Sequence, residues 1–268
     1  MELLAVIAVV SILLAMLVPS VTAARQAAYR VVSAANQRTL GQGIIMWAGG
    51  KDSELPHSRV FEENPLDLAE LMRVFEPEVE ADDDVRPGGY QQDMMTPGDR
   101  YMAHLNAGEI DFGWDGLGHL YRGYFVSDPA VFYSPAHSGD HPFEELEDLW
   151  VHPDTRQVPD STIYANYHYV GHLDEDGRDI KLHDDSERIL IVDGLRTRMD
   201  LNGRDGINVL WVDNSVHWRS CPGLFHHLDP TPRGADEPPK GKQNDIIRSV
   251  FNGTLLEQLK KYELDPNS

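Results

Sequence analysis

The sequence predicts an α+β fold in which a long N-terminal helix packs on a head built around an antiparallel β-sheet. The first observation is an apolar run from Leu3 to Val18 whose only polar residue is Ser11. The second is helical spacing that continues from Gln26 to Ala48. The third is a pair of strand-like runs, 188–194 and 206–218, the second of which contains its own turn. The first two observations predict a helix that is first transmembrane and then amphipathic, and the third predicts the antiparallel sheet.

The composition is that of a folded globular chain rather than a disordered or fibrous one. Of the 268 residues, 41% are hydrophobic and 25% are charged. Acidic residues number 44 and basic residues 23, so the net charge is -21, and such a chain repels phosphate backbones. We therefore expect no nucleic-acid partner. Cys221 is the single cysteine, which excludes an internal disulfide and a cysteine-rich zinc site.

The apolar start has three competing interpretations. Its 16 residues span about 24 Å as a helix, slightly less than a bilayer needs, and residues 19–24 extend it. A cleaved secretory signal is one interpretation, because Val21-Thr22-Ala23 is a small-residue cleavage pattern. A generic membrane anchor is the second, and a filament-type helix is the third. A buried core helix is disfavoured because the run is apolar on all sides.

The third interpretation comes from a resemblance carried by Glu2, the apolar run behind it, and Pro19. This pattern resembles the N-terminal helix of type IV pilins and type II secretion pseudopilins, which carry a glutamate near the start and a proline seventeen residues later. The resemblance implies that Glu2 pairs with the N-terminal amine of a neighbouring subunit, since a lone carboxylate at a lipid span is costly. The alternative is that Glu2 simply lies at the water interface.

The region before the glutamate differs from the family pattern. Relatives have a basic leader, a glycine and four further residues there, whereas here Met1 directly precedes Glu2. We expect either a start upstream of Met1 or a chain that prepilin peptidase does not process. Arg25, Arg30 and Arg38 follow the span, which by itself favours a cytoplasmic head, and a basic leader would reverse that orientation. The resemblance implies a single pass in the bacterial inner membrane, with the head in the periplasm or on a surface filament.

Two further segments resemble the same family. Residues 116–135 resemble a helix that leads into a strand, with Ser134 where relatives often have cysteine. Residues 206–218 resemble the C-terminal signature of a histidine, nine residues, then Asp-Gly, although Gly203 and Asn214 replace its histidine and glycine. Asp213-Asn214 suits a tight hairpin turn. The signature is matched by Gly206, Asn208, Asp213, Ser215 and Val216.

The chain divides into three expected parts. Residues 1–48 form the transmembrane and pilin-type helix, 49–227 a pseudopilin-like head, and 228–268 a linker followed by a C-terminal helix. Within the head we expect a short helix over 65–75, an aromatic strand over 161–170 and a strand over 188–194. Whether the C-terminal helix packs on the head or on a neighbour is left open by the sequence.

The sequence offers no catalytic pattern, so we expect no enzyme and no cofactor. It contains no phosphate-binding glycine loop, no Gly-x-Ser-x-Gly and no His-Glu-x-x-His. His137 and His141 have a ligand-like spacing, but glycine and proline make their segment a loop. Residues 174–179 have the carboxylates of a Ca²⁺ loop without the EF-hand spacing, so a solvated turn is expected there, with Ca²⁺ as the weaker alternative.

The expected function is that of a membrane-anchored structural subunit of a type II secretion or type IV pilus-like filament. By resemblance, its partners are other pilin-like subunits, inner-membrane components of the secretion system, prepilin peptidase where a leader exists, and membrane lipid. Two alternatives stay open. One is a membrane-tethered ligand-binding protein, and the other is a secreted hydrolase with a cleaved signal.

Overall fold

The computed structural model describes an α+β chain with a long N-terminal helix and antiparallel sheets, as the sequence predicted. The part of the chain that it describes comprises residues 2–58, 73–75, 113–137, 141–150, 159, 161–172, 179–195, 197–201, 206–221, 223–228 and 241–252. The carboxylate run 174–178 and the signature position Gly203 lie outside these residues, as does most of the segment 228–240.

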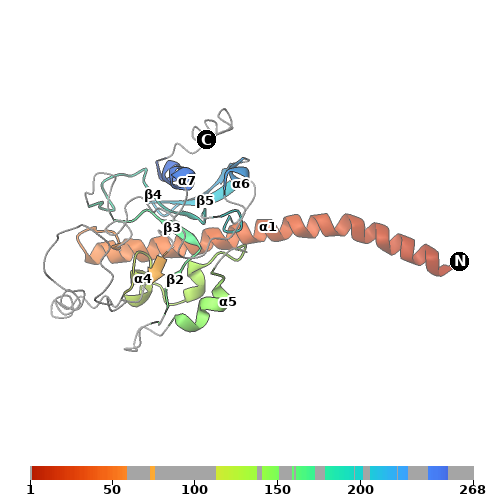
Figure 1. Cartoon of the computed structure of the whole chain (residues 1–268), viewed down its shortest axis with the longest axis horizontal. Helices are drawn as coiled ribbons and strands as arrows, with labels where there is room; N and C mark the ends of the chain where they lie inside the picture. The colour runs from red at the N-terminus through yellow and green to blue at the C-terminus, as the bar shows by residue number, and fades with distance from the viewer. Residues whose placement is uncertain are drawn as a thin grey trace, which may run out of the picture.

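Helix α1 (Glu2–Gly50) is one continuous helix of 49 residues. At 1.5 Å per residue it is about 73 Å long. Figure 1 shows that its N-terminal half projects from the head as a bare rod, while its C-terminal half lies between the sheet and the smaller elements. The long helix therefore links two different environments without a break.

The main sheet has four antiparallel strands in the order β3-β4-β5-β6. Its strands are β3 (Tyr167–Tyr169), β4 (Ile189–Asp193), β5 (Gly206–Trp211) and β6 (Val216–Ser220). A second, two-stranded sheet pairs β1 (Arg73–Phe75) with β2 (Ile163–Tyr164). Strand β4 is buried along its whole length, as expected for a continuous apolar run that is covered on both faces.

Helices cover the two faces of the main sheet (Figure 1). On one face, α1 packs against the sheet together with α4 (Gly118–Arg122) and the 3-10 turn η2 (Pro129–Phe132). The other face is covered by α6 (Leu224–His227) and α7 (Gly241–Phe251). Helix α7 buries Ile246, Ile247 and Val250 against the sheet, so the C-terminal helix packs on its own head.

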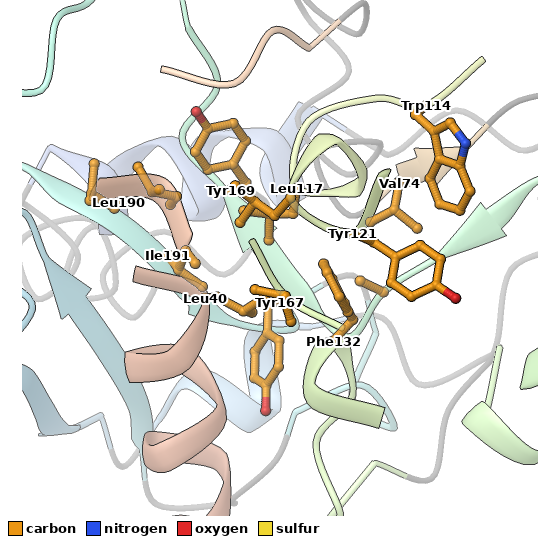
Figure 2. Packing of buried hydrophobic residues seen from close by; sticks show 14 of the residues in the cluster. Leu40, Val74, Trp114, Leu117, Tyr121, Phe132, Tyr167, Tyr169, Leu190 and Ile191 are labelled. Atoms are coloured by element: carbon orange, nitrogen blue, oxygen red, sulfur yellow. The ribbon is translucent and has the colours of Figure 1, made fainter. Parts of the chain in front are cut away.

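Two hydrophobic clusters follow from this layering. Figure 2 shows the larger one, in which Leu40 of α1 lies beside Tyr167 of β3 and Ile191 of β4, with Phe132 of η2 nearby. The second cluster lies on the far face of the sheet and joins Ile207 and Val209 of β5 to helix α7. Leu210 of β5 belongs to the first cluster, so successive side chains of this strand point to opposite faces of the sheet.

Three local expectations differ from the structure. Arg73–Phe75 is strand β1 rather than the end of a helix, because it pairs with β2; residues 65–72 are not described. Pro129–Phe132 is a 3-10 turn rather than a strand, because the Asp128 carboxylate accepts a hydrogen bond from the Ala130 amide and Pro129 starts the turn. The aromatic run forms two strands of different sheets, separated at Ala165-Asn166.

Candidate functional site

The exposed half of α1 is the first component of the candidate site. Its described large apolar side chains between Val6 and Val21 are between 47% and 72% exposed, with Met16 the most exposed. Among the described residues, α1 is the one helix that is long and apolar enough to cross a membrane, and its most apolar window is not buried. This half therefore presents apolar surface on all sides, without a partner in the single chain.

The described hydroxyl groups of the apolar half are satisfied within the helix. The hydroxyls of Ser11, Ser20 and Thr22 donate to the carbonyls of Ile7, Leu17 and Val18, at 2.8, 2.7 and 3.0 Å. These internal bonds remove the need for water at those positions. Pro19 lies inside the helix and lacks the amide that would continue the ladder there. The helix is therefore suited to an apolar surrounding.

The second half of α1 is fastened to the sheet by a buried carboxylate. Asp193, the last residue of β4, is fully buried and accepts hydrogen bonds from the Ser33 hydroxyl and the Gln37 amide, each at 2.9 Å. Its other oxygen accepts the backbone amide of Asn208 at 2.7 Å. The carboxylate therefore joins one helix and two strands. Hydrogen bonds to a charged carboxylate are stronger than hydrogen bonds between neutral groups.

The side chains around Asp193 complete the network. The second amide proton of Gln37 points to the Asn208 carbonyl at 3.4 Å, and the Asn208 side chain donates to the Arg30 carbonyl at 3.2 Å. Because the Ser33 proton is used on Asp193, the Tyr167 hydroxyl donates to the Ser33 oxygen at 3.2 Å. Burial, followed by the Asp193 charge, raises the pKa of Tyr167 and keeps it a donor.

Helix α1 also approaches the hairpin closely through a glycine. A Cβ atom added at Gly41 would lie 2.3 Å from Asn214 Oδ1 and 2.9 Å from Leu210 Cδ2. At the edge of the head, the Arg30 guanidinium lies 4.1 Å from the centre of the Trp218 ring, a cation–π geometry. The position and the rotation of the helix are therefore set by the β5–β6 hairpin.

The hairpin residues that matched the signature lie together around β5 and β6. Asn214 has φ 64°, and the Trp211 carbonyl accepts its amide at 2.9 Å, which closes the turn. Bonds from the Ser215 hydroxyl and amide lower the pKa of the Asp213 carboxyl. Gly206 is required because a Cβ there would lie 2.1 Å from the Arg219 carbonyl oxygen. Val216, half-buried, pairs with Leu210.

Glu2 and Pro19 are not brought together with the hairpin. Glu2 is the first residue of α1, and its side chain lies outside the described part of the chain. Pro19 lies in the projecting half. Of the apolar residues at helical spacing in the second half, Leu40 is buried as expected, whereas Val31 is 69% exposed; the buried face also carries Ser33, Gln37 and Ile44. Ser33 and Gln37 are four residues apart and therefore share one face of the helix. This spacing was the sequence signal that could have revealed the hydrogen-bond network around Asp193.

The two histidines with ligand-like spacing have separate surroundings. His137 lies 3.7 Å from the buried Asp200 carboxylate, whereas the His141 ring stacks on Tyr164 with centres 4.6 Å apart. Within the described residues, no group of three or more histidine, cysteine or acidic side chains is placed to hold a metal ion. Burial raises the pKa of the Cys221 thiol, which favours the unreactive protonated form.

A pair of stacked histidines, which the sequence did not single out, fastens the segment after α1. The rings of His57 and His172 have centres 4.1 Å apart. The buried His172 accepts the Ser58 backbone amide on Nδ1 at 2.9 Å, so that nitrogen carries no proton. Burial, and then the charge of His57, lower the pKa of His172 to about 4.

No family model matches the chain, and no curated protein or solved structure matches it significantly. The assignment of function therefore rests on the geometry of α1 and on the sequence patterns that it carries. Its two halves have opposite requirements. The first needs an apolar surrounding, and the second is held rigidly on a folded acidic head.

Proposed function

We propose that the protein is a membrane-anchored, pseudopilin-like structural subunit that assembles into a filament through its N-terminal helix. The observation that carries the proposal is the single helix α1, apolar and exposed in its first half and docked on the sheet in its second. In this proposal the membrane holds the helix before assembly, and the helices of neighbouring copies surround it afterwards.

The exposed apolar surface of α1 is costly in water. Burying one large aliphatic side chain is worth about 2 kcal/mol, so a helix with such residues on all sides is strongly driven out of water. A lipid bilayer or a bundle of identical helices meets that need. Because α1 is continuous, the position of the head follows the position of the helix. Stacking of helices would therefore stack heads at regular spacing.

The resemblance supplies the finer expectations. Glu2 would pair with the N-terminal amine of a neighbour within the apolar bundle, where a lone carboxylate is costly. The partners would be other pilin-like subunits and inner-membrane secretion components, and prepilin peptidase would act on an upstream leader. The head would lie in the periplasm or on a surface filament. A tethered binding protein and a secreted hydrolase are the competing functions.

The first test is intact-mass and N-terminal peptide analysis of the protein purified from membranes of its native host. A methylated N-terminal residue a few positions before Glu2 is the expected result and supports prepilin processing. A mature chain that starts at Ala24 removes the anchor and Glu2 together and overturns the proposal in favour of an exported soluble protein. An unprocessed span with no self-association favours the tethered binding protein.

The second test is cross-linking of copies in native membranes. In a Cys221→Ser background, Met16→Cys and Leu13→Cys place single thiols on the exposed half of α1. A bismaleimide should link copies into dimers and higher ladders at both positions. Glu187→Cys, exposed on a loop of the head, is the matched control and should give no ladder. Equal linkage at all three positions would indicate random collision rather than ordered helix packing.

A further inference from the structure

The docked half of α1 keeps one side uncovered. The sheet covers one side of the helix, and η2 and α4 cover another. The remaining side is exposed along about four turns of the helix. We call this surface the outer stripe, and it consists of Val31, Val32, Ala35, Arg38, Thr39, Gln42, Ile45 and Met46. Met46 is 52% exposed, and Arg38 supplies the only charge in the stripe.

Charge is divided unequally between the helix and the rest of the chain. Residues 3–50 contain three arginines and no lysine or acidic residue. Residues 51–268 contain 43 acidic and 20 basic residues, a net charge of -23. Two heads brought side by side would repel each other. The outer stripe is a largely apolar surface with two neutral polar residues, Thr39 and Gln42, and a single positive charge, so it complements an acidic partner.

The head contains an acidic segment that no described lysine or arginine neutralises. Glu144, Glu145, Glu147 and Asp148 are all exposed on α5 (Phe143–Leu146) and η3 (Glu147–Leu149). None of the four forms a salt bridge within the part of the chain that the structure describes. By contrast, Asp52 is already paired with Lys181 at 2.6 Å. Partly buried Phe143 and Leu149 flank the acidic segment and add apolar surface to it.

We propose that the outer stripe of one copy binds the acidic segment Glu144–Asp148 of a second copy. The inference rests on the proposed filament function and adds a contact between helix and head to the contact between apolar helices. An arginine that meets carboxylates at the edge of an apolar contact forms charge-assisted hydrogen bonds. Because the two surfaces differ, the contact is head-to-tail and leaves one of each surface free for the next copy.

Anionic lipid headgroups share the carboxylates' attraction for arginine, but the geometry favours a second copy. Arg25 follows the apolar half directly, whereas Arg38 lies 13 residues further on, about 20 Å along the helix axis. The helix contacts the sheet on either side of Arg38, through the bond from Gln37 to Asp193 and the close approach of Gly41 to Leu210. A headgroup at the end of the membrane span therefore meets Arg25, and Arg38 faces neighbouring protein.

The test uses full-length protein in native membranes and a Cys221→Ser background. Copies with Thr39→Cys, within the stripe, are co-expressed with copies with Glu145→Cys, and a bismaleimide links the two. Arg38→Glu should lower this mixed cross-link at least about tenfold, because like charges opposed across an interface cost several kcal/mol. Adding Glu144→Lys and Glu147→Lys to the second copy should restore it. Arg219→Glu, the same charge change on strand β6, is the control and should have no effect.

The outcomes separate this inference from the proposed function. If Met16→Cys copies still cross-link while Arg38→Glu leaves the mixed cross-link unchanged, the stripe contact is wrong and the helix bundle stands. If the lysine variants fail to restore a cross-link lost in Arg38→Glu, the acidic segment is not the partner and an anionic lipid is favoured. If neither the Met16 nor the mixed cross-link forms, the filament proposal itself fails. Circular dichroism of each variant checks that the exposed substitutions leave the fold intact.

Discussion

The carboxylate of Asp193 at the end of strand β4 accepts the hydroxyl proton of Ser33 on helix α1 at 2.9 Å, across 160 positions of sequence. This bond, with the Gln37 and Asn208 bonds to the same side chain, ties the long helix to the sheet. The first half of the helix projects from the head, so a force on that half reaches the head in part through this network.

Asp193→Ala should destabilise the head by at least about 3 kcal/mol, because it leaves the Ser33, Gln37 and Asn208 donors buried without an acceptor. Denaturant unfolding followed by tryptophan fluorescence in detergent measures the change. Asp185→Ala, in an exposed turn, is the control and should stay within about 0.5 kcal/mol of the parent. An equal effect of both variants would show that the network adds nothing specific.

Gly41→Ala should also destabilise the protein, by about 1 to 3 kcal/mol, because its Cβ would be forced against Asn214 and Leu210. Gly49→Ala offers a matched control in the same helix, since a Cβ at Gly49 meets nothing within 4 Å. There the better helix propensity of alanine should stabilise by about 0.5 kcal/mol or more. Thermal unfolding of the two variants should therefore shift in opposite directions.

The turn of the hairpin should tolerate glycine better than any branched residue. Asn214 has φ 64°, a conformation that glycine adopts without strain. Asn214→Gly should leave the midpoint of unfolding nearly unchanged, whereas Asn214→Val should destabilise by about 1 to 2 kcal/mol. A parallel loss in both variants would place the role of Asn214 in its side chain rather than in its backbone.

Acidification should weaken the attachment of the segment that follows α1, because His172 becomes protonated. Its pKa is lowered to about 4 in the folded protein, while an unfolded chain has the ordinary value near 6.5. The unfolded state therefore binds more protons between these values, and His172 costs stability as the pH falls from 6.5 to 4. The groups that act on it are His57 and His119, which oppose its protonation, and Asp115 and Asp179, which favour it.

His172→Asn keeps an acceptor near the Ser58 amide but does not titrate. The stability of this variant should therefore fall less than that of the parent between pH 6.5 and 4. Hydrogen exchange at the Ser58 amide gives a local measurement of the same event. His217→Asn, on the exposed strand β6, serves as control and should follow the parent. Identical pH profiles for parent and His172→Asn would contradict the assigned role.

Local patterns predicted the elements whose residues follow a clear period. The apolar run predicted the first half of α1, and the alternating run with Asp213-Asn214 predicted the β5–β6 hairpin. The predicted secondary structure was wrong where a distant pairing partner determines the conformation of a segment. Arg73–Phe75 reads as helix by itself and is a strand because Ile163–Tyr164 lies beside it. Val31 fits an amphipathic helix and is exposed, because the shape of the head selects a different face.

The sequence by itself determined the apolar helix, its polar continuation, the terminal hairpin and the acidity of the head, because each follows from neighbouring residues or from composition. The tertiary structure alone decided that Ser33 and Gln37 face Asp193, that His57 stacks on His172, and that α7 covers its own sheet. Those relationships join residues far apart in the chain. They depend on which surfaces fit together once the elements have formed, and no local period encodes that choice.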